Sequence, residues 1–257
     1  MLTAIRQRDK QKILARDAQK AETPFYCPKC LCEVILHKGN IRVHHFNHKP
    51  SVTCTWGQGE TNQHYSAKLA IYDALLAEPN VSGAELEKDF GISVADVFAV
   101  INETPVAIEV QRSNLSVSDI TSRTKNYYRL GICVLWVALP TKDLWDNKYS
   151  LNAWGKWCHA AYFGRVYYWD SGQYFHVVHF DQHLLHVEYK TWYEPGGYEN
   201  SAGGYDRISK RYKTPHHGQR VKLSKDFRPI NKDAWSGGSV IIPECRLYVD
   251  RQQKWWK

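Results

Sequence analysis

The chain has 257 residues, of which 43% are hydrophobic, so it can bury one large core or two small ones and is too apolar for wholesale disorder. Its 34 Lys and Arg outnumber 26 Asp and Glu, for a net charge of +8, and it holds 10 Trp and 16 Tyr. Cations bind phosphates and aromatic rings stack on bases, so this composition favours a nucleic-acid partner.

The sequence has no run of 18 apolar residues and no apolar leader after its first basic residues. We therefore expect a cytoplasmic protein without a membrane partner. Seven cysteines are present, an odd number, and four crowd into one short segment: Cys27, Cys30, Cys32 and Cys54. This spacing indicates metal binding rather than a disulfide framework.

Residues 1–57 form a first predicted unit. Residues 1–24 fit either a solvated helix or two short strands joined by a turn at Arg8-Asp9-Lys10, and we favour the hairpin. From Phe25 to Thr55 the composition shifts to Cys, His, Lys and Gly without periodicity, which predicts a small module organised by a metal and lacking its own core.

The predicted metal of this module is a structural Zn²⁺. Cys27 and Cys30 form a CxxC pair, His48 follows after seventeen residues and Cys54 after five more, which suits a tetrahedral Cys₃His site. His45 competes with His48, and Cys32 could replace either thiol of the pair. The alternative is a set of reduced, buried cysteines.

Residues 60–77 read as a helix that Thr61 or Asn62 caps and Pro79-Asn80 ends. Its apolar residues recur at helical spacing: Tyr65, Leu69, Tyr72 and Leu76. Polar residues four apart mark another face: Glu60, His64 and Lys68.

Two strands, 94–101 and 106–113, flank a turn at residues 102–105 and predict a hairpin. A helix from Ser116 or Ser118 to Leu130 and an apolar buried strand, 132–139, follow. This order predicts an α/β layer.

The hairpin carries two candidate metal ligands. If Ile101 faces Thr104, Asp96 lies opposite Glu109 with Cβ atoms about 4.5–5.5 Å apart, and Gln111 shares the face of Glu109. Two carboxylates this close destabilise a sheet unless a cation lies between them, and Mg²⁺ or Mn²⁺ prefers such ligands. The alternative is a pair of solvent-facing acids on an ordinary hairpin.

A set of ordered motifs resembles the CoiA-like competence-protein family, which belongs to the PD-(D/E)XK nuclease superfamily. The motifs are GE-x3-H-x3-K (59–68), ADV (95–97), IEVQ-x-S (108–113), R-x3-Y (123–127) and the VLWV strand. The resemblance covers roughly residues 10–140 and also includes Y-C-P-x-C and H-F-x-H-K in the cysteine-rich segment.

This resemblance implies a restriction-endonuclease-like αβββαβ core in which Asp96 and Glu109 bind the catalytic metal. Gln111 occupies the superfamily's usual Lys position, as in the CoiA-like branch, and would position the attacking water. Lys68 is our candidate for the missing positive charge, and Glu60 for completing the metal shell.

Candidate DNA contacts follow the hairpin. Arg112 ends the second strand, and Arg123 and Tyr127 lie one helical turn apart, where they could hold a phosphate. In the alternative interpretation the helix packs Tyr127 inward and leaves Arg123 solvated.

Beyond Pro140 the sequence predicts a β-rich region with a hairpin turning at residues 170–172 and a Gly-rich loop at 195–206. Between Arg207 and Arg228, eight Lys or Arg accompany one acid, and Lys210, Arg211 and Lys213 are candidate DNA contacts. A solvated or disordered tail fits equally well. The histidines at 176, 179, 183 and 186 are expected to be scattered, because 176 and 179 lie on opposite faces of a strand.

We therefore expect residues 1–57 as a hairpin and zinc module, 58–140 as a nuclease core and 141–257 as an aromatic and basic region, either separate or part of the same domain. The predicted function is an Mg²⁺- or Mn²⁺-dependent deoxyribonuclease in competence, recombination or defence against foreign DNA, with a recombination or defence protein as a further partner. The rivals are a catalytically silent DNA-binding protein and a ribonuclease. The sequence leaves the oligomeric state open.

Overall fold

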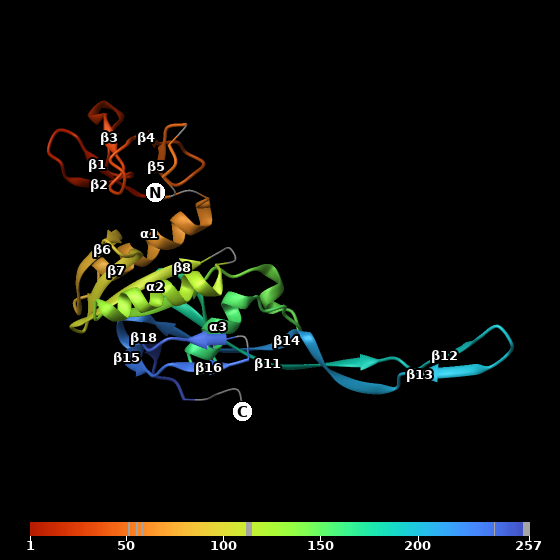
Figure 1. The fold of residues 1–257 in the computed structure, drawn as a ribbon. Coiled ribbons are helices and arrows are strands. Elements are labelled where there is room, and N and C mark those ends of the chain that lie inside the picture. The colour runs from red at the N-terminus through yellow and green to blue at the C-terminus, as the bar shows by residue number, and fades with distance from the viewer. Residues whose placement is uncertain (51, 55, 58, 112–114, 239, 254–257) are drawn as a thin grey trace.

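Two hydrophobic cores organise the chain, one in an N-terminal module and one in the larger body below it (Figure 1). The computed structural model describes residues 1–257 except 51, 55, 58, 112–114, 239 and 254–257. Within the described part, none of the helices has the length and apolar character needed to cross a membrane.

The N-terminal module is a five-stranded sheet with the order β2-β1-β3-β4-β5 and one short 3₁₀ helix. The elements are β1 (Thr3–Arg6), β2 (Lys12–Leu14), η1 (Lys20–Glu22), β3 (Phe25–Tyr26), β4 (Glu33–His37) and β5 (His45–His48). The predicted hairpin around Arg8-Asp9-Lys10 is confirmed as β1 and β2.

The prediction that this module lacks a core was wrong. Its strands bury a small apolar cluster that includes Ala4, Phe25, Val34, Leu36 and Phe46. The rings of Phe25 and Phe46 lie 5.1 Å apart at its centre. Val34 and Leu36 alternate within β4, but the other residues lie far apart in the sequence, and the pairing of five short strands brings them together.

The next six elements follow the order helix, three strands, helix, strand. They are α1 (Asn62–Leu76), β6 (Val81–Asp89), β7 (Val94–Ile101), β8 (Thr104–Gln111), α2 (Val117–Arg129) and β9 (Cys133–Ala138). Thr61 caps α1 and Ser116 caps α2, each by accepting a hydrogen bond from a backbone N–H, as predicted. The sequence pattern gives no strand signal for β6, because its residues are mostly polar.

The buried face of α1 differs from the predicted one. Of the four residues in the apolar stripe only Tyr65 is buried, and Leu76 is 55% exposed. The helix instead packs Ala67, Ile71 and Leu75 toward the body. Lys68 belongs to this inward side, so the polar stripe faces the protein interior rather than solvent.

One nine-stranded sheet forms the body, with the path β14-β11-β10-β9-β8-β7-β6, where β14 is Tyr205–Lys222, and with β18 joining β9 and β15. Strand β9 is central and every residue in it is buried. Residues 141–250 complete this sheet and its surroundings with η2 (Lys142–Trp145), α3 (Ala153–Ala161), β10 (Val166–Ser171), β11 (Tyr174–Val187), α4 (Leu223–Asp226), β15 (Phe227–Lys232), β16 (Trp235–Gly237), β17 (Val240–Ile242) and β18 (Cys245–Asp250).

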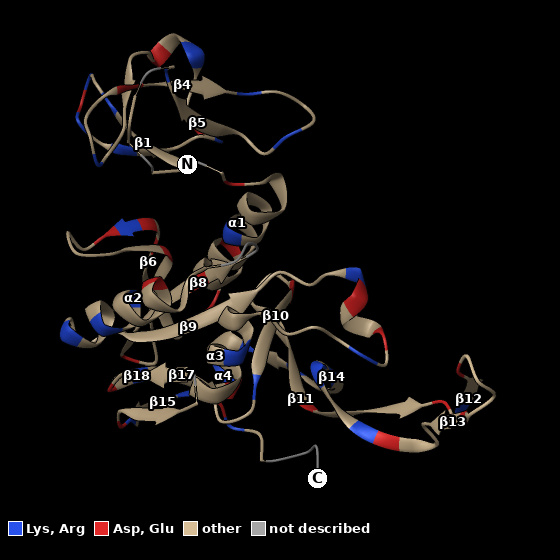
Figure 2. Cartoon of the chain, turned by 45° about the vertical axis from the view of Figure 1, so that its right-hand side comes forward, with Lys and Arg blue, Asp and Glu red and all other residues tan. Residues whose placement is uncertain are grey.

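A long two-stranded arm projects from the body (Figures 1 and 2). It consists of the distal half of β11 paired with β14 (Tyr205–Lys222), and its tip is the hairpin of β12 (Lys190–Tyr193) and β13 (Glu199–Ala202). The Gly-rich segment predicted as a loop therefore contains strand β13, and the basic segment is a strand rather than a disordered tail. The tip exposes several aromatic side chains: Tyr189, Trp192, Tyr193, Tyr198 and Tyr205.

The hairpin of β7 and β8 has the register that the sequence predicted. Ile101 pairs with Thr104 and Val97 with Ile108, and the same count places Asp96 opposite Glu109. The two-residue turn needs positive φ at both positions, 45° at Asn102 and 64° at Glu103. Asn tolerates this conformation, whereas Glu is strained in it.

We predict that Glu103→Gly raises the free energy of unfolding by about 0.5–1 kcal/mol, because glycine removes the Cβ strain at positive φ. Urea denaturation would measure the change. Glu103→Ala is the matched control and should give no gain, since alanine keeps the Cβ. Equal stabilisation by both variants would contradict this account of the turn.

Candidate functional site

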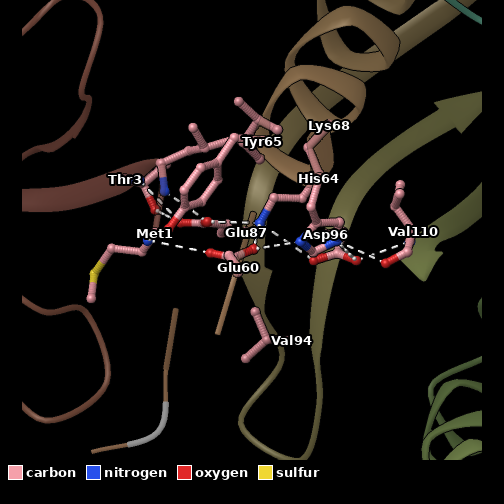
Figure 3. Close-up of polar contacts among 12 residues, drawn as sticks. Met1, Thr3, Glu60, His64, Tyr65, Lys68, Glu87, Val94, Asp96 and Val110 are labelled. Carbon is pink, nitrogen blue, oxygen red and sulfur yellow. Dashed lines mark hydrogen bonds and ion pairs between the residues drawn. The ribbon is translucent and has the colours of Figure 1, made fainter. Parts of the chain in front are cut away.

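Lys68 of α1 lies at the centre of a buried cluster of charged groups (Figure 3). Its Nζ donates to Glu60, lies 3.0 Å from Oε1 of Glu87 and lies 3.5 Å from Oδ1 of Asp96. Burial lowers the pKa of Lys68, but the three carboxylates outweigh burial and hold that pKa well above its ordinary value. The lysine is therefore a permanent cation among acids that come from the segment before α1, from β6 and from β7.

His64, one turn before Lys68, is a second cation in the cluster. Its Nδ1 lies 3.1 Å from Oε1 of Glu60, and its Nε2 lies 2.8 Å from the carbonyl of Val110 and 3.4 Å from Oδ2 of Asp96. Burial lowers the pKa of His64, but the charge and hydrogen bond of Asp96 and the hydrogen bond to Glu60 outweigh it and raise the pKa to about 9. With acceptors at both ring nitrogens, the imidazolium form is favoured.

Glu60, His64 and Asp96 could hold a metal ion once the His64 ring loses its proton, because their ligand atoms all lie within 4.8 Å of one another. Burial raises the pKa of both carboxyls, but Lys68 and His64 outweigh it and keep them ionised. Oε2 of Glu60 is buried and accepts no hydrogen bond in the described part of the chain, although the Met1 amino group lies 3.3 Å away. Such oxygens with spare lone pairs suit a hard cation.

A cavity of about 810 Å³ opens onto this cluster. Glu60, Lys68, Glu87 and Asp96 line it from below, and Trp56 and Gly57 line it from the N-terminal module. Lys29 and Arg123 add positive charge to its wall. The cluster is therefore accessible to a ligand even though its members are largely buried.

Sequence reasoning missed Glu87. The pairs Leu86–Val97 and Lys88–Ala95 place it opposite Asp96, in an irregular stretch where its own φ is +48°. Its carboxylate accepts the backbone N–H groups of Leu2 and Thr3 at 2.7 and 3.0 Å and the Thr3 hydroxyl at 2.7 Å. An acid two residues from the end of a polar strand gives no sign of burial, and only the docking of β1 buries it.

Glu109 lies on the other side of Asp96, so three carboxylates form one row across β6, β7 and β8. It is fully buried, with Arg123 Nη2 2.5 Å from Oε2 and the Tyr127 hydroxyl donating to Oε1. Burial raises the pKa of Glu109 to about 7, with Arg123 opposing and Asp96 adding to the rise. Its two oxygens thus bind α2, and it lies outside the metal-ligand group among the described residues.

The other predicted catalytic and DNA-binding residues are dispersed. Gln111 lines a separate cavity of about 90 Å³ with Tyr149, Trp154 and Tyr168, away from the cavity at Asp96. Tyr127 packs inward with no exposed surface, as in the alternative interpretation, but Arg123 is not solvated as that interpretation expected. Arg123 is partly buried, donating to Glu109 and the Val94 carbonyl.

The predicted basic contacts lie on the arm. Lys210, Arg211 and Lys213 are in β14, whereas the cluster is built from α1, the residues just before it, β6 and β7. Figure 1 shows that β14 extends away from these elements. Arg112 lies outside the described residues. Two histidines of β11 each form a hydrogen bond with another histidine, His179 with His159 and His176 with His217. Within the described residues, none of these four belongs to a group that could hold a metal ion.

The second candidate metal centre is in the N-terminal module. Ligand atoms of Cys27, Cys30, His48 and Cys54 lie within 4.8 Å of one another, and Nε2 of His48 is 3.3 Å from Sγ of Cys30. His45 instead uses Nδ1 at the Val43 carbonyl, 2.8 Å away. Three thiols and an imidazole could hold a metal such as zinc.

Family comparisons divide the chain at the same place as the fold does. A sequence model described as competence protein CoiA, N-terminal domain, matches residues 5–57. A second, described as competence protein CoiA, nuclease-like domain, matches residues 60–189. A search of curated proteins and a search of solved structures each found no match.

We predict that Cys54→Ser loses the metal of the N-terminal module and makes that module sensitive to proteolysis, while the body stays folded on its own core. Zinc content after gel filtration and limited proteolysis would measure both effects. Cys32→Ser is the matched control and should keep the metal, because Cys32 is exposed and outside the ligand group. Full zinc content in Cys54→Ser would contradict the assignment.

We also predict a pH dependence of stability from His64. Since its pKa rises from 6.5 to about 9 on folding, its contribution is fully present below pH 6.5 and is lost as pH rises through 9. The free-energy difference between wild type and His64→Gln should shrink by on the order of 2–3 kcal/mol from pH 6 to 10. Urea titrations without added Mg²⁺ or Mn²⁺ would measure it.

His159→Gln is the control for this experiment. Burial lowers the pKa of His159 to about 4, so His159 is neutral in the folded and unfolded states above pH 8. Its substitution should change stability by the same amount at pH 8 and pH 10. A constant difference for His64→Gln across the whole range would exclude the imidazolium.

Proposed function

The chain belongs to the CoiA competence-protein family, and from this premise we propose that it is a metal-dependent nuclease that hydrolyses DNA phosphodiester bonds in competence and recombination. The cluster of Glu60, His64 and Asp96 around Lys68, open to a cavity of about 810 Å³, carries the proposal. The same chemistry would serve defence against foreign DNA. Four thiols crowded in one metal-binding segment favour a cytoplasmic site of action.

We propose a PD-(D/E)XK-like core formed by α1, β6, β7, β8, α2 and β9. The order of these elements is the αβββαβ order that such a core requires. Asp96 on β7 and Glu109 on β8 then occupy the paired acidic positions of the fold.

The metal ligands in this proposal are Asp96 and Glu109, with Glu60 completing the shell. Asp96 and Glu60 are ionised and line the cavity, so they can bind Mg²⁺ or Mn²⁺ in the observed conformation. Glu109 has a pKa of about 7 and is held by Arg123, so it joins only after it loses its proton and Arg123 moves. A bound divalent ion would polarise the scissile phosphate and lower the pKa of its water.

Lys68 and His64 supply the positive charge that Gln111 cannot. Lys68 lies 3.5 Å from Asp96 and stays charged, so it can stabilise charge that develops on the phosphate. His64, held as an imidazolium between Glu60 and Asp96, adds a second positive charge beside the proposed metal ligands. The proposed role of Gln111, orienting the attacking water, requires it to reach beyond its present cavity.

DNA binding in this proposal extends from the site to the arm. Arg123, on the wall of the cavity, would exchange Glu109 for a substrate phosphate. Arg112 and the arm residues Lys210, Arg211 and Lys213 would contact the backbone farther away. The Cys₃His site would hold a structural Zn²⁺, since its four protein ligands leave no open position.

A catalytically silent DNA-binding protein is the second candidate. The observation that favours it is Glu109, whose two oxygens are both engaged by α2. The two candidates bind the same ligand, so only cleavage separates them.

We predict that zinc-loaded protein cuts DNA with Mn²⁺ or Mg²⁺ and is inactive in their absence. Asp96→Asn and Lys68→Met should each lower the cleavage rate by about 10²-fold or more, because each removes charge from the reacting centre. Single-stranded DNA, duplex DNA and RNA should be offered in parallel, with product formation followed on gels.

Asp73→Asn is the matched control, an acid on the exposed face of the same helix that pairs with Arg16. It should cut at the wild-type rate. If all proteins bind DNA and none cuts it with either metal, the silent-protein reading replaces the nuclease. Cleavage of RNA alone would transfer the proposal to a ribonuclease.

A further inference from the structure

We infer that a second cavity, between the N-terminal module and α1, binds the strand that continues from the scissile phosphate. The N-terminal module is then one wall of the substrate groove as well as a metal-stabilised fold. This inference rests on the proposed function, because it takes the substrate to be a nucleic acid.

The second cavity has a volume of about 540 Å³, the size that encloses a ligand of a few hundred daltons. One wall comes from β5 and its flanks: Arg42, His45, Asn47, His48, Lys49, Pro50 and Val52. The other wall comes from the start of α1, with Asn62 and Tyr65. Apart from Glu60, the charged side chains that line this cavity are basic: Arg42 and Lys49.

The two cavities meet. Trp56, Gly57 and Glu60 line both of them, so a chain that places one phosphate at Asp96 can continue past Glu60 into the second cavity. Trp56 is largely buried at this junction. A small free anion would occupy one cavity alone, whereas a polymer that binds both needs the two cavities to be connected.

The lining of this path changes from acidic at Asp96 to basic in the second cavity. A nuclease substrate needs a metal ion at the scissile phosphate and cations along the rest of its backbone. The cavity at Asp96 has an acidic floor that suits a divalent cation. The second cavity presents the exposed cations Arg42 and Lys49, which suit phosphates. Lys49 already pairs with Glu33 at 2.7 Å, while Arg42 takes part in no ion pair within the described residues.

The wall is fixed to the body by contacts at both ends. Glu87 accepts the backbone of Leu2 and Thr3, and Lys12 Nζ donates to the carbonyls of Leu86 and Glu87 at 2.7 and 2.8 Å. On the other side, the backbone N–H of Val43 donates to Asn62 at 2.7 Å. A groove held in this way needs little rearrangement to receive a strand.

The test uses binding rather than cleavage. Zinc-loaded Asp96→Asn protein would be titrated with fluorescent DNA oligonucleotides of increasing length, at several salt concentrations and with zinc content checked. Added to this protein, Arg42→Glu and Lys49→Glu should each weaken binding of long oligonucleotides about tenfold. Each should also reduce the slope of log K against log salt by about 0.7 for single strands. Lys20→Glu, an exposed lysine on η1 outside both cavities, is the matched control.

The effect of Arg42→Glu should vanish with oligonucleotides too short to leave the cavity at Asp96, which separates a local contact from a general change in charge. If the parent protein binds and wild type cuts DNA, but Arg42→Glu and Lys49→Glu match Lys20→Glu at every length, the inference is overturned and the proposed function stands. If the Asp96→Asn protein does not bind DNA and the wild type does not cut it, this inference and the proposed function are both overturned.

Discussion

The burial of Lys68 is the constraint on which the rest of the site depends. A buried ammonium is unstable unless acids surround it, and three acids do so here from three different segments: Glu60, Glu87 and Asp96. In each of these acids, the charge of Lys68 is the largest of the effects that lower the pKa against burial. The ion cluster therefore fixes the position of α1 over the sheet and preserves a set of charged oxygens at one end of the cavity.

The same cluster joins the two parts of the chain. Glu87 neutralises Lys68 with one oxygen and binds the backbone of β1 with both, so the N-terminal module docks on a residue that also belongs to the site. Loss of this carboxylate would remove one of the three acids around Lys68 and the acceptor of the Leu2 and Thr3 backbone. The fold thus couples the placement of the metal-binding module to the charge balance of the candidate active centre.

Asp96 and Glu109 show how one row of acids can have different electrostatic states. Asp96 lies beside Lys68 and His64, which keep its pKa low, whereas burial raises the pKa of Glu109 to about 7. Within the described residues, the side chains that bind Glu109 are the cation Arg123 and the phenol of Tyr127. A carboxylate ready to bind a cation and one close to its protonation midpoint are therefore neighbours. Paired acids with pKa values driven apart are a recurrent feature of catalytic sites.

Local signals in the sequence were sufficient for several elements. The caps of α1 and α2, the two-residue turn before Thr104 and the apolar run of β9 depend on residues close together in the chain, and all were predicted. The Cys₃His group was also predictable from spacing, because a metal site of this kind requires ligands at short intervals. The register of β7 and β8 followed from the turn alone.

Only the tertiary structure decided which charged groups meet. Glu87 and Lys68 are nineteen residues apart, and nothing local distinguishes either from a solvated residue; the docking of β1 and α1 buries both. The partners of Glu109, the separate cavity of Gln111 and the conversion of the basic segment into an arm likewise depend on long-range pairing. Sequence pattern sets the period of an element, whereas burial and pKa depend on neighbours that the fold brings from elsewhere in the chain.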